Sequence, residues 1–106
     1  MVIDGLKRYE KIFFLGIGGV SMSALAEFLS VNAYTVCGFD DNDGERIAHL
    51  KKLGISVYEK KVTDLVISEL LSSNIVVFTD AIASEHFLFR RAQIEGKVLI
   101  SRSELL

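Results

Sequence analysis

The sequence contains no proline, a single cysteine and no long uninterrupted run of apolar residues. A lone cysteine, Cys37, cannot form an internal disulfide, and its place in an apolar run predicts a core residue. No stretch approaches the roughly 20 apolar residues that a membrane helix needs, and the first residues carry charges without the apolar centre of a signal peptide. We therefore expect a cytoplasmic protein with no membrane segment.

Clustered positive charge and metal-ligand patterns are also missing. The net charge is -2 at pH 7, and the Lys and Arg residues are dispersed along the chain, which argues against a nucleic-acid-binding surface. His49 and His86 have no Cys, His or carboxylate partners at metal-ligand spacing. No G-x-x-x-x-G-K-[ST] sequence occurs, so we expect no phosphate loop for ATP and magnesium in these residues. Small molecules and protein partners are the ligand classes left open.

The 106 residues, half of them apolar and a quarter charged, are enough for one domain with one core. Short apolar runs alternate with segments of helical period, which is typical of successive β-α units. This predicts a Rossmann-like α/β fold, a three-layer sandwich of a five-stranded, mostly parallel sheet with helices on both faces. The expected strands are 11–15, 35–39, 56–58, 75–79 and 98–101. The expected helices are 20–31, 45–53, 63–71 and 84–94, the last with Ser84 as its N-cap.

A glycine-rich turn follows the first expected strand and opens the first expected helix. Its sequence is Gly16-Ile17-Gly18-Gly19-Val20-Ser21. The strand delivers Gly16 into a tight turn, Gly18 has no side chain to block a pyrophosphate, and free N–H groups of the first helical turn would point at the anion. The turn therefore predicts a site for a nucleotide diphosphate. The alternative is a turn whose glycines only satisfy backbone geometry.

Polar residues follow two other strands at the same predicted edge of the sheet. Asp40 closes the second strand, where dinucleotide-binding folds place a carboxylate that reaches a ribose hydroxyl. Alternatively, residues 40–44 form a solvated turn in which Asp43 caps the second helix. The fourth strand is followed by Thr79, Asp80, Ala81 and Ile82. These residues either contact the same phosphates or only lead to the fourth helix.

The stretch that starts at Phe14, F-L-G-I-G-G-V-S-M-S-A-L-A-E, resembles the opening motif of the UDP-N-acetylmuramate:L-alanine ligases of the Mur ligase family. The doubled glycine followed by Met22-Ser23 separates it from an ordinary dinucleotide fingerprint. Further similarities keep the order and spacing of that family, in Gly38-Phe39-Asp40, Leu53-Gly54-Ile55, Ala81-Ile82 and S-R-S-E-L-L at 101–106. The resemblance runs from Ile12 onward and extends to the related ligase that attaches a recycled tripeptide to the same muramate.

The resemblance implies that residues 1–106 are the N-terminal domain of a longer ATP-dependent acid-amino acid ligase of peptidoglycan synthesis. It implies UDP-N-acetylmuramate and the remaining ligase domains as partners, with ATP and magnesium held by those other domains. Gly16, Gly18 and Gly19 would face the diphosphate, Asp40 would lie near the uridine, and Thr79, Ala81 and Ile82 would border the phosphates and sugar. Ile17, Val20, Ser21, Asp80 and Arg102 complete the expected substrate-binding set. No catalytic residue and no cofactor are expected in this chain itself.

Several positions depart from the family's pattern. Ser21 and Ala24 stand at usually glycine-rich positions, Thr79-Asp80 replaces Ser-Ser, His86-Phe87 replaces Asn-Pro, and Glu59-Lys60 replaces a Gly-His near the uracil. Two further hypotheses therefore stay open. One is an NAD(P)-binding dehydrogenase domain, which Asp40 favours and Ser21 opposes because it stands at the third fingerprint glycine. The other is a non-catalytic module that kept the fold and lost the ligand.

Overall fold

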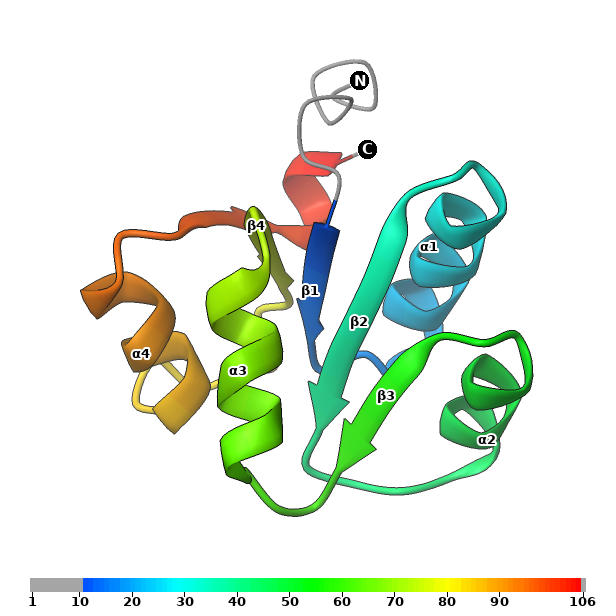
Figure 1. The fold of residues 1–106 in the computed structure, drawn as a ribbon, viewed down its shortest axis with the longest axis horizontal. Helices are drawn as coiled ribbons and strands as arrows, with labels where there is room; N and C mark the ends of the chain where they lie inside the picture. Colours follow the sequence, from blue (N-terminus) through cyan, green and yellow to red (C-terminus); the bar gives the residue numbers. More distant parts are fainter. Residues whose placement is uncertain (1–10, 106) are drawn as a thin grey trace.

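The structure is a computed structural model that describes residues 11–105 (Figure 1). Its elements in chain order are β1 (Lys11–Leu15), α1 (Val20–Val31), β2 (Thr35–Asp40), α2 (Glu45–Lys52), β3 (Ser56–Glu59), α3 (Asp64–Ser72), β4 (Ile75–Phe78), α4 (Phe87–Ile94), β5 (Val98–Ser101) and a short 3₁₀ helix (Arg102–Leu105). In this part of the chain no helix is both long enough and apolar enough to cross a membrane.

The five strands form one sheet in the order β3-β2-β1-β4-β5. Every neighbouring pair is parallel, so the sheet is wholly parallel where the sequence predicted a mostly parallel one. Residues 12–15 of the central strand β1 are fully buried, as expected for a strand that is covered on both faces. The arrows of β2 and β3 point to the bottom of Figure 1, and the carboxyl edge of the sheet therefore lies there.

Helices cover both faces of the sheet, α1 and α2 on one and α3 and α4 on the other (Figure 1). Successive β1 side chains point to opposite faces, so Phe14 joins the core beneath α1 and α2, and Phe13 joins the core beneath α3 and α4. Cys37 is buried in the second core, and burial raises the pKa of its thiol to about 11. The predicted Rossmann-like three-layer sandwich is therefore confirmed, and so is the core position of the cysteine.

The expected start of helix α4 is wrong. Helix α4 begins at Phe87 rather than Ser84, and its N-cap is His86, whose Nδ1 accepts the Leu88 N–H at 3.1 Å. The cause is a turn closed by the His86 N–H on the Ala83 carbonyl at 2.9 Å, after which the imidazole nitrogen acts as the capping acceptor. Helix α2 begins at Glu45, as expected; its N-cap is Gly44, with no side-chain cap.

Strand β4 ends at Phe78, one residue earlier than expected. Thr79 therefore belongs to the loop after the strand, together with residues 80–82. This shift leaves Thr79 at the carboxyl edge, where the sequence placed it.

Candidate functional site

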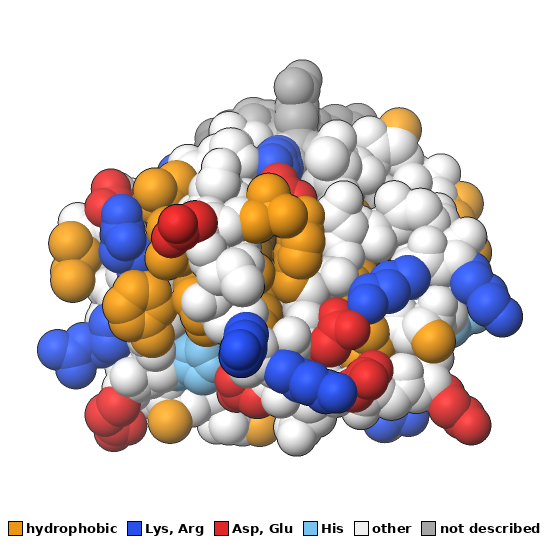
Figure 2. All heavy atoms as spheres, turned by 60° about the horizontal axis from the view of Figure 1, so that its bottom comes forward, with side chains coloured by type: hydrophobic (Ala, Val, Ile, Leu, Met, Phe, Trp, Pro, Cys, Tyr) orange, Lys and Arg blue, Asp and Glu red, His pale blue; other side chains and the backbone are white. Residues whose placement is uncertain are grey.

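Strand β1 lies between β2 and β4. The chain builds the sheet outward from β1 through β2 and β3 on one side, and then returns to the other side of β1 to form β4. Such a reversal of strand order is where open α/β sheets bind ligands, outside the carboxyl ends of the strands. The glycine turn after β1 and the loop 79–82 after β4 flank this switch point. Figure 2 shows this edge facing the reader, with acidic and basic side chains side by side and apolar side chains gathered toward one side. The edge is therefore not a surface of one charge sign.

The glycine turn is held by its own backbone and by β2. The N–H groups of Gly16 and Ile17 donate to the Phe39 carbonyl at 2.8 and 3.2 Å, and the Gly19 N–H donates to the Gly16 carbonyl at 3.2 Å. Gly16 has a φ of +89°, a left-handed conformation that glycine adopts without steric cost. The tight turn expected at Gly16 is therefore present, and these three N–H groups are occupied.

Asp40 accepts the remaining N–H of the turn. Its Oδ2 accepts from the Gly18 N–H at 2.8 Å, and its Oδ1 accepts from the Asn42 N–H at 2.9 Å. A Cβ added at Gly18 would lie 2.8 Å from that Oδ2 and 3.0 Å from Cδ1 of Ile47. The space beside Gly18 is therefore filled by the protein's own side chains, a reason for this glycine that the sequence pattern does not reveal.

The first turn of α1 supplies the N–H groups that an anion can reach. A helix leaves its first N–H groups without intrahelical acceptors, and within residues 11–105 the N–H groups of Val20, Ser21 and Met22 have no protein acceptor. No side chain caps this end, whose N-cap is Gly19. The helix dipole adds about half a positive charge there. An anion is thus favoured at residues 20–22 rather than inside the glycine turn.

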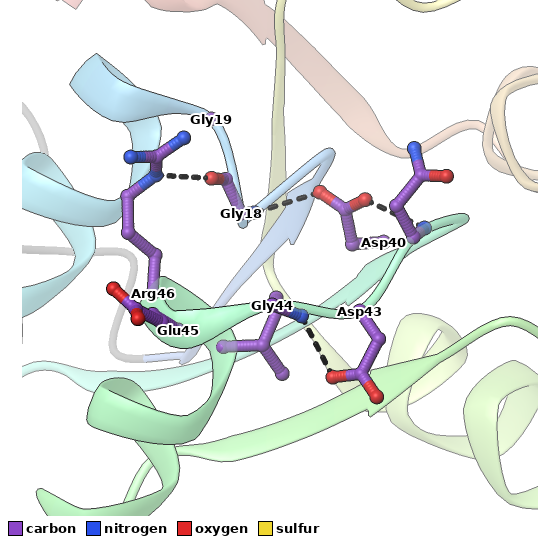
Figure 3. Close-up of a pocket in the computed structure, with 9 residues that line it drawn as sticks. Gly18, Gly19, Asp40, Asp43, Gly44, Glu45 and Arg46 are labelled. Carbon is purple, nitrogen blue, oxygen red and sulfur yellow. Dashed lines mark hydrogen bonds between the residues drawn. The ribbon is translucent and has the colours of Figure 1, made fainter.

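Arg46 lies in the first turn of α2 and contacts the glycine turn from the side opposite Asp40. Its Nε donates to the Gly18 carbonyl at 2.8 Å. Figure 3 shows Arg46 and Asp40 on opposite sides of Gly18, one bonded to its carbonyl and the other to its N–H. Arg46 could not be singled out from the sequence, because its contact joins residues 28 positions apart and no local pattern marks it.

Three hollows lie along this edge. The β2–α2 hollow has a volume of about 470 Å³ and is lined by Gly18, Gly19, Asp40, Asn42, Asp43, Gly44, Glu45, Arg46 and Ile47 (Figure 3). The switch-point hollow has a volume of about 210 Å³ and is lined by Leu15, Gly16, Gly19, Phe39, Asp40, Asp41, Asn42, Thr79, Ala81 and Ile82. Because Gly19 and Asp40 line both, the two hollows adjoin each other at the glycine turn.

The third, the Arg102 hollow, has a volume of about 290 Å³ and is lined by Ser21, Thr79, Asp80, Arg102 and Ser103. Among the described residues, Nε of Arg102 is a buried polar side-chain atom without a hydrogen-bond partner. Asp80 lines the same hollow, yet forms no ion pair with Arg102 within the described part of the chain. An unpaired buried donor is costly, and a bound acceptor in this hollow would relieve that cost.

The 3₁₀ helix that carries Arg102 is fixed at both ends. Glu104 Oε1 accepts the Ser101 N–H at 3.0 Å and the Ser101 hydroxyl at 2.9 Å, and these bonds hold the pKa of Glu104 below its usual range. Leu105 is buried in the core beneath α1 and α2. The S-R-S-E-L sequence thus anchors the segment while Arg102 faces the hollow.

The structure brings most of the predicted residues to one edge. The exceptions are Ile17, whose side chain is fully buried in the core, and Val20, which is 70% exposed and lines none of the three hollows. Ile17 therefore contributes to packing and Val20 offers only its backbone N–H. Asp43 does not cap α2; instead its Oδ1 accepts the neighbouring Gly44 N–H at 2.8 Å.

The positions that depart from the family pattern have partners of their own. His86 Nε2 lies 3.1 Å from Asp41 Oδ1, and its ring packs edge-on against Phe39, so it joins the loop before α4 to the loop after β2. Glu59 accepts from Lys51 Nζ at 2.7 Å. The described residues contain no group of three His, Cys, Asp or Glu side chains that could hold a metal ion.

Comparisons with known proteins agree on one family. A sequence model described as "Mur ligase family, catalytic domain" matches residues 11–106. The UDP-N-acetylmuramate–L-alanine ligase of Caldanaerobacter subterraneus subsp. tengcongensis is 34% identical over 106 residues, which cover 100% of this chain and 22% of the relative. The enzyme of the same name from Clostridium perfringens is 36% identical over 107 residues, again covering 100% of this chain and 22% of the relative.

Solved structures agree with the sequence relatives. The UDP-N-acetylmuramate-alanine ligase of Thermotoga maritima matches with a TM-score of 0.81 and 32% identity, covering 90% of this chain and 21% of that chain. The murein peptide ligase of Psychrobacter arcticus matches with a TM-score of 0.78 and 24% identity, covering 92% and 20%, a likeness that shows the fold alone. The chain spans about a fifth of the length of these relatives. Because the family's sequence model covers nearly all of it, the chain belongs to the Mur ligase family.

Proposed function

We propose that this chain is the N-terminal, substrate-binding domain of a cytoplasmic ATP-dependent ligase, and that it binds UDP-N-acetylmuramate. The parent reaction is the addition of L-alanine to the muramate carboxyl in peptidoglycan precursor synthesis, as in the enzymes named above. One observation carries the proposal. Ser21, whose N–H is one of the free N–H groups at the start of α1, lines the same hollow as Arg102, whose Nε is unpaired, and a doubly charged diphosphate bound there would satisfy both.

The remaining predicted residues are assigned from their places around this anion site. Ser21 and Thr79 line the Arg102 hollow and offer hydroxyl donors to the phosphates. Ala81 and Ile82 border the switch-point hollow on the side of β4, where we place the muramyl sugar. Asp40 has lone pairs left after accepting two backbone N–H groups, and these can accept the ribose hydroxyls. The domain's contribution is to hold the substrate in place.

ATP and magnesium do not fit the residues of this chain. The sequence has no phosphate loop with a lysine, and the described residues hold no metal-ligand cluster. In the proposed parent enzyme both bind to other domains. The choice between alanine and a recycled tripeptide as the second substrate also belongs to those domains, since the muramate nucleotide is common to both reactions.

The alternatives are less well supported. A dehydrogenase domain would use a third fingerprint glycine for close packing of helix against strand, whereas Ser21 at that position is exposed and lines the Arg102 hollow. The family comparison also favours the ligases. In a module without a ligand, the buried guanidinium nitrogen of Arg102 would stay without a hydrogen-bond partner, which is rare in folded proteins.

Isothermal calorimetry with UDP-N-acetylmuramate tests the proposal on the wild-type chain and on Arg102→Met. The variant should bind about tenfold or more weakly, because a charge-assisted hydrogen bond is lost. Its melting temperature should not fall, because the lost Nε has no partner in the free protein. Arg90→Met, at an exposed residue of α4 outside the three hollows, is the charge-matched control and should bind as the wild type does. Equal affinity of Arg102→Met and wild type would remove Arg102 from the site.

A further inference from the structure

Arg46 is a positively charged residue at the edge of the site, and it lies outside the sequence stretches that resemble the family. Its Nε donates to the Gly18 carbonyl at 2.8 Å, which sets the orientation of the planar guanidinium. Within the described residues no carboxylate lies within 4.0 Å of it. A guanidinium has five N–H donors, and four of them are left for another acceptor. Arg46 therefore presents a preoriented positive group without a protein counter-ion.

The charges around the β2–α2 hollow indicate what Arg46 can bind. The other charged side chains that line the hollow are Asp40, Asp43 and Glu45, all acidic. Asp40 and Asp43 both accept backbone N–H groups of the loop. An anion is repelled from that side and attracted to the Arg46 side, where Gly19 leads into the free N–H groups of α1 (Figure 3).

Arg46 and Arg102 reach the start of α1 from different hollows. Arg46 lines the β2–α2 hollow, next to Asp40, and Arg102 lines the hollow formed with Ser21 and Thr79. Asp40 marks the ribose side in the proposed function, so Arg46 lies toward the nucleoside and Arg102 toward the sugar. Guanidinium groups suit phosphate oxygens because their paired donors match the spacing of two oxygens.

We propose that Arg46 binds the phosphate next to the nucleoside of the UDP-sugar, while Arg102 binds the phosphate next to the muramyl sugar. This inference rests on the proposed function, since it assigns the two phosphates of that substrate. Arg46 has a second effect in the free protein, because its Nε and the Asp40 carboxylate hold the two ends of Gly18. The same side chain thus positions the glycine turn and supplies charge to the ligand.

Uridine, UMP and UDP separate the two phosphates experimentally. We would titrate each into the wild-type chain, Arg46→Met, Arg102→Met and the control Arg90→Met, and follow backbone amide shifts by NMR. Arg46→Met should weaken UMP and UDP by about tenfold and leave uridine within about twofold. Arg102→Met should weaken UDP and leave UMP unchanged. Arg46→Lys should recover part of the affinity, since it keeps the charge but not the paired donors.

The positioning role has its own readout. The amides of Gly18 and Gly19 should shift in ligand-free Arg46→Met and not in Arg90→Met, because only the former loses the bond to the Gly18 carbonyl. Wild-type affinity of Arg46→Met for UMP would overturn the phosphate assignment, and so would equal weakening of uridine, UMP and UDP. If the wild type bound UDP with the predicted Arg46 dependence but did not bind UDP-N-acetylmuramate, the proposed function would fail and the Arg46 contact would stand. Failure of the wild type to bind any of these ligands would overturn both.

Discussion

The Gly18 N–H donates to Asp40 Oδ2 at 2.8 Å, and this bond ties the glycine turn after β1 to the end of β2. Gly18 lies in the turn after β1, and Asp40 is the last residue of the neighbouring parallel strand β2, in which Phe39 pairs with Leu15. The acidic residue at the end of β2 is usually read as a ribose ligand. In this chain its carboxylate also holds the glycine turn, so a substitution at either residue should affect folding and, under the proposed function, binding.

Gly18→Ala should destabilise the chain by about 1 to 3 kcal/mol, the range for overpacking a well-filled site. The added Cβ would lie 2.8 Å from Asp40 Oδ2 and 3.0 Å from Ile47 Cδ1. Gly19→Ala is the matched control, because its nearest contact would be an ordinary 3.6 Å. Urea denaturation of the three proteins measures the difference. Equal midpoints for the two variants would show that the space beside Gly18 is not filled as described.

Asp40→Ala should lower both stability and affinity, by about 1 to 2 kcal/mol each. Two backbone N–H groups, of Gly18 and Asn42, lose their acceptor, and in the proposed complex the ribose hydroxyls lose theirs. Asp40→Asn keeps one acceptor oxygen and should lie between Ala and wild type in both measurements. Denaturation and calorimetry with UDP-N-acetylmuramate are the assays. A stability loss without any change in affinity would restrict Asp40 to the turn.

Cys37 should make stability fall as the pH rises from about 9 to about 11. Burial is the largest cause that raises the pKa of its thiol from the ordinary 9.0 to about 11. Above pH 9 the unfolded chain therefore loses this proton more readily than the folded one. The stabilisation is complete below the unfolded pKa and is lost as the pH rises through the folded value.

Denaturation of wild type and Cys37→Ala across this window isolates the thiol, because the raised pKa of Tyr58 is present in both proteins. The stability difference between the two should shrink or reverse above pH 9. A constant difference up to pH 11 would contradict the buried, neutral thiol. In the native state at pH 8, the thiol should also react with iodoacetamide far more slowly than in urea.

The fold could be predicted from the sequence because its signals are local. Continuous apolar runs such as residues 11–15 and helical periods such as residues 20–31 give elements whose ends the structure reproduces. The start of α4 could not be predicted, because serine is a commoner N-cap residue than histidine. In the structure a turn at residues 83–86 precedes the helix, and His86 is its N-cap.

The site could be predicted only in outline. The glycine turn, Asp40 and Thr79 follow from motifs at strand ends, which the parallel sheet brings together, whereas Arg102 follows from the resemblance to the Mur ligases. Tertiary packing sets the side-chain positions on which three other features depend. These are the contact of Arg46 with Gly18, the contact of Asp40 with Gly18 and the unpaired Nε of Arg102. Ile17 shows the opposite error, since a motif residue next to glycines turned out to belong to the core.

The other proposals depend on the binding of UDP-N-acetylmuramate at the switch point of this chain. Amide shift perturbation by NMR tests it most directly, with UDP-N-acetylmuramate and NADH titrated separately into the labelled 106-residue chain. We predict saturable shifts with the UDP-sugar at residues 16–22, Asp40, 79–82 and Arg102, weaker or no shifts with NADH, and no ATP hydrolysis with or without alanine. Saturable shifts at these residues with NADH and none with the UDP-sugar would contradict it in favour of a dehydrogenase domain, and no shifts with either ligand would indicate a module that has lost its ligand.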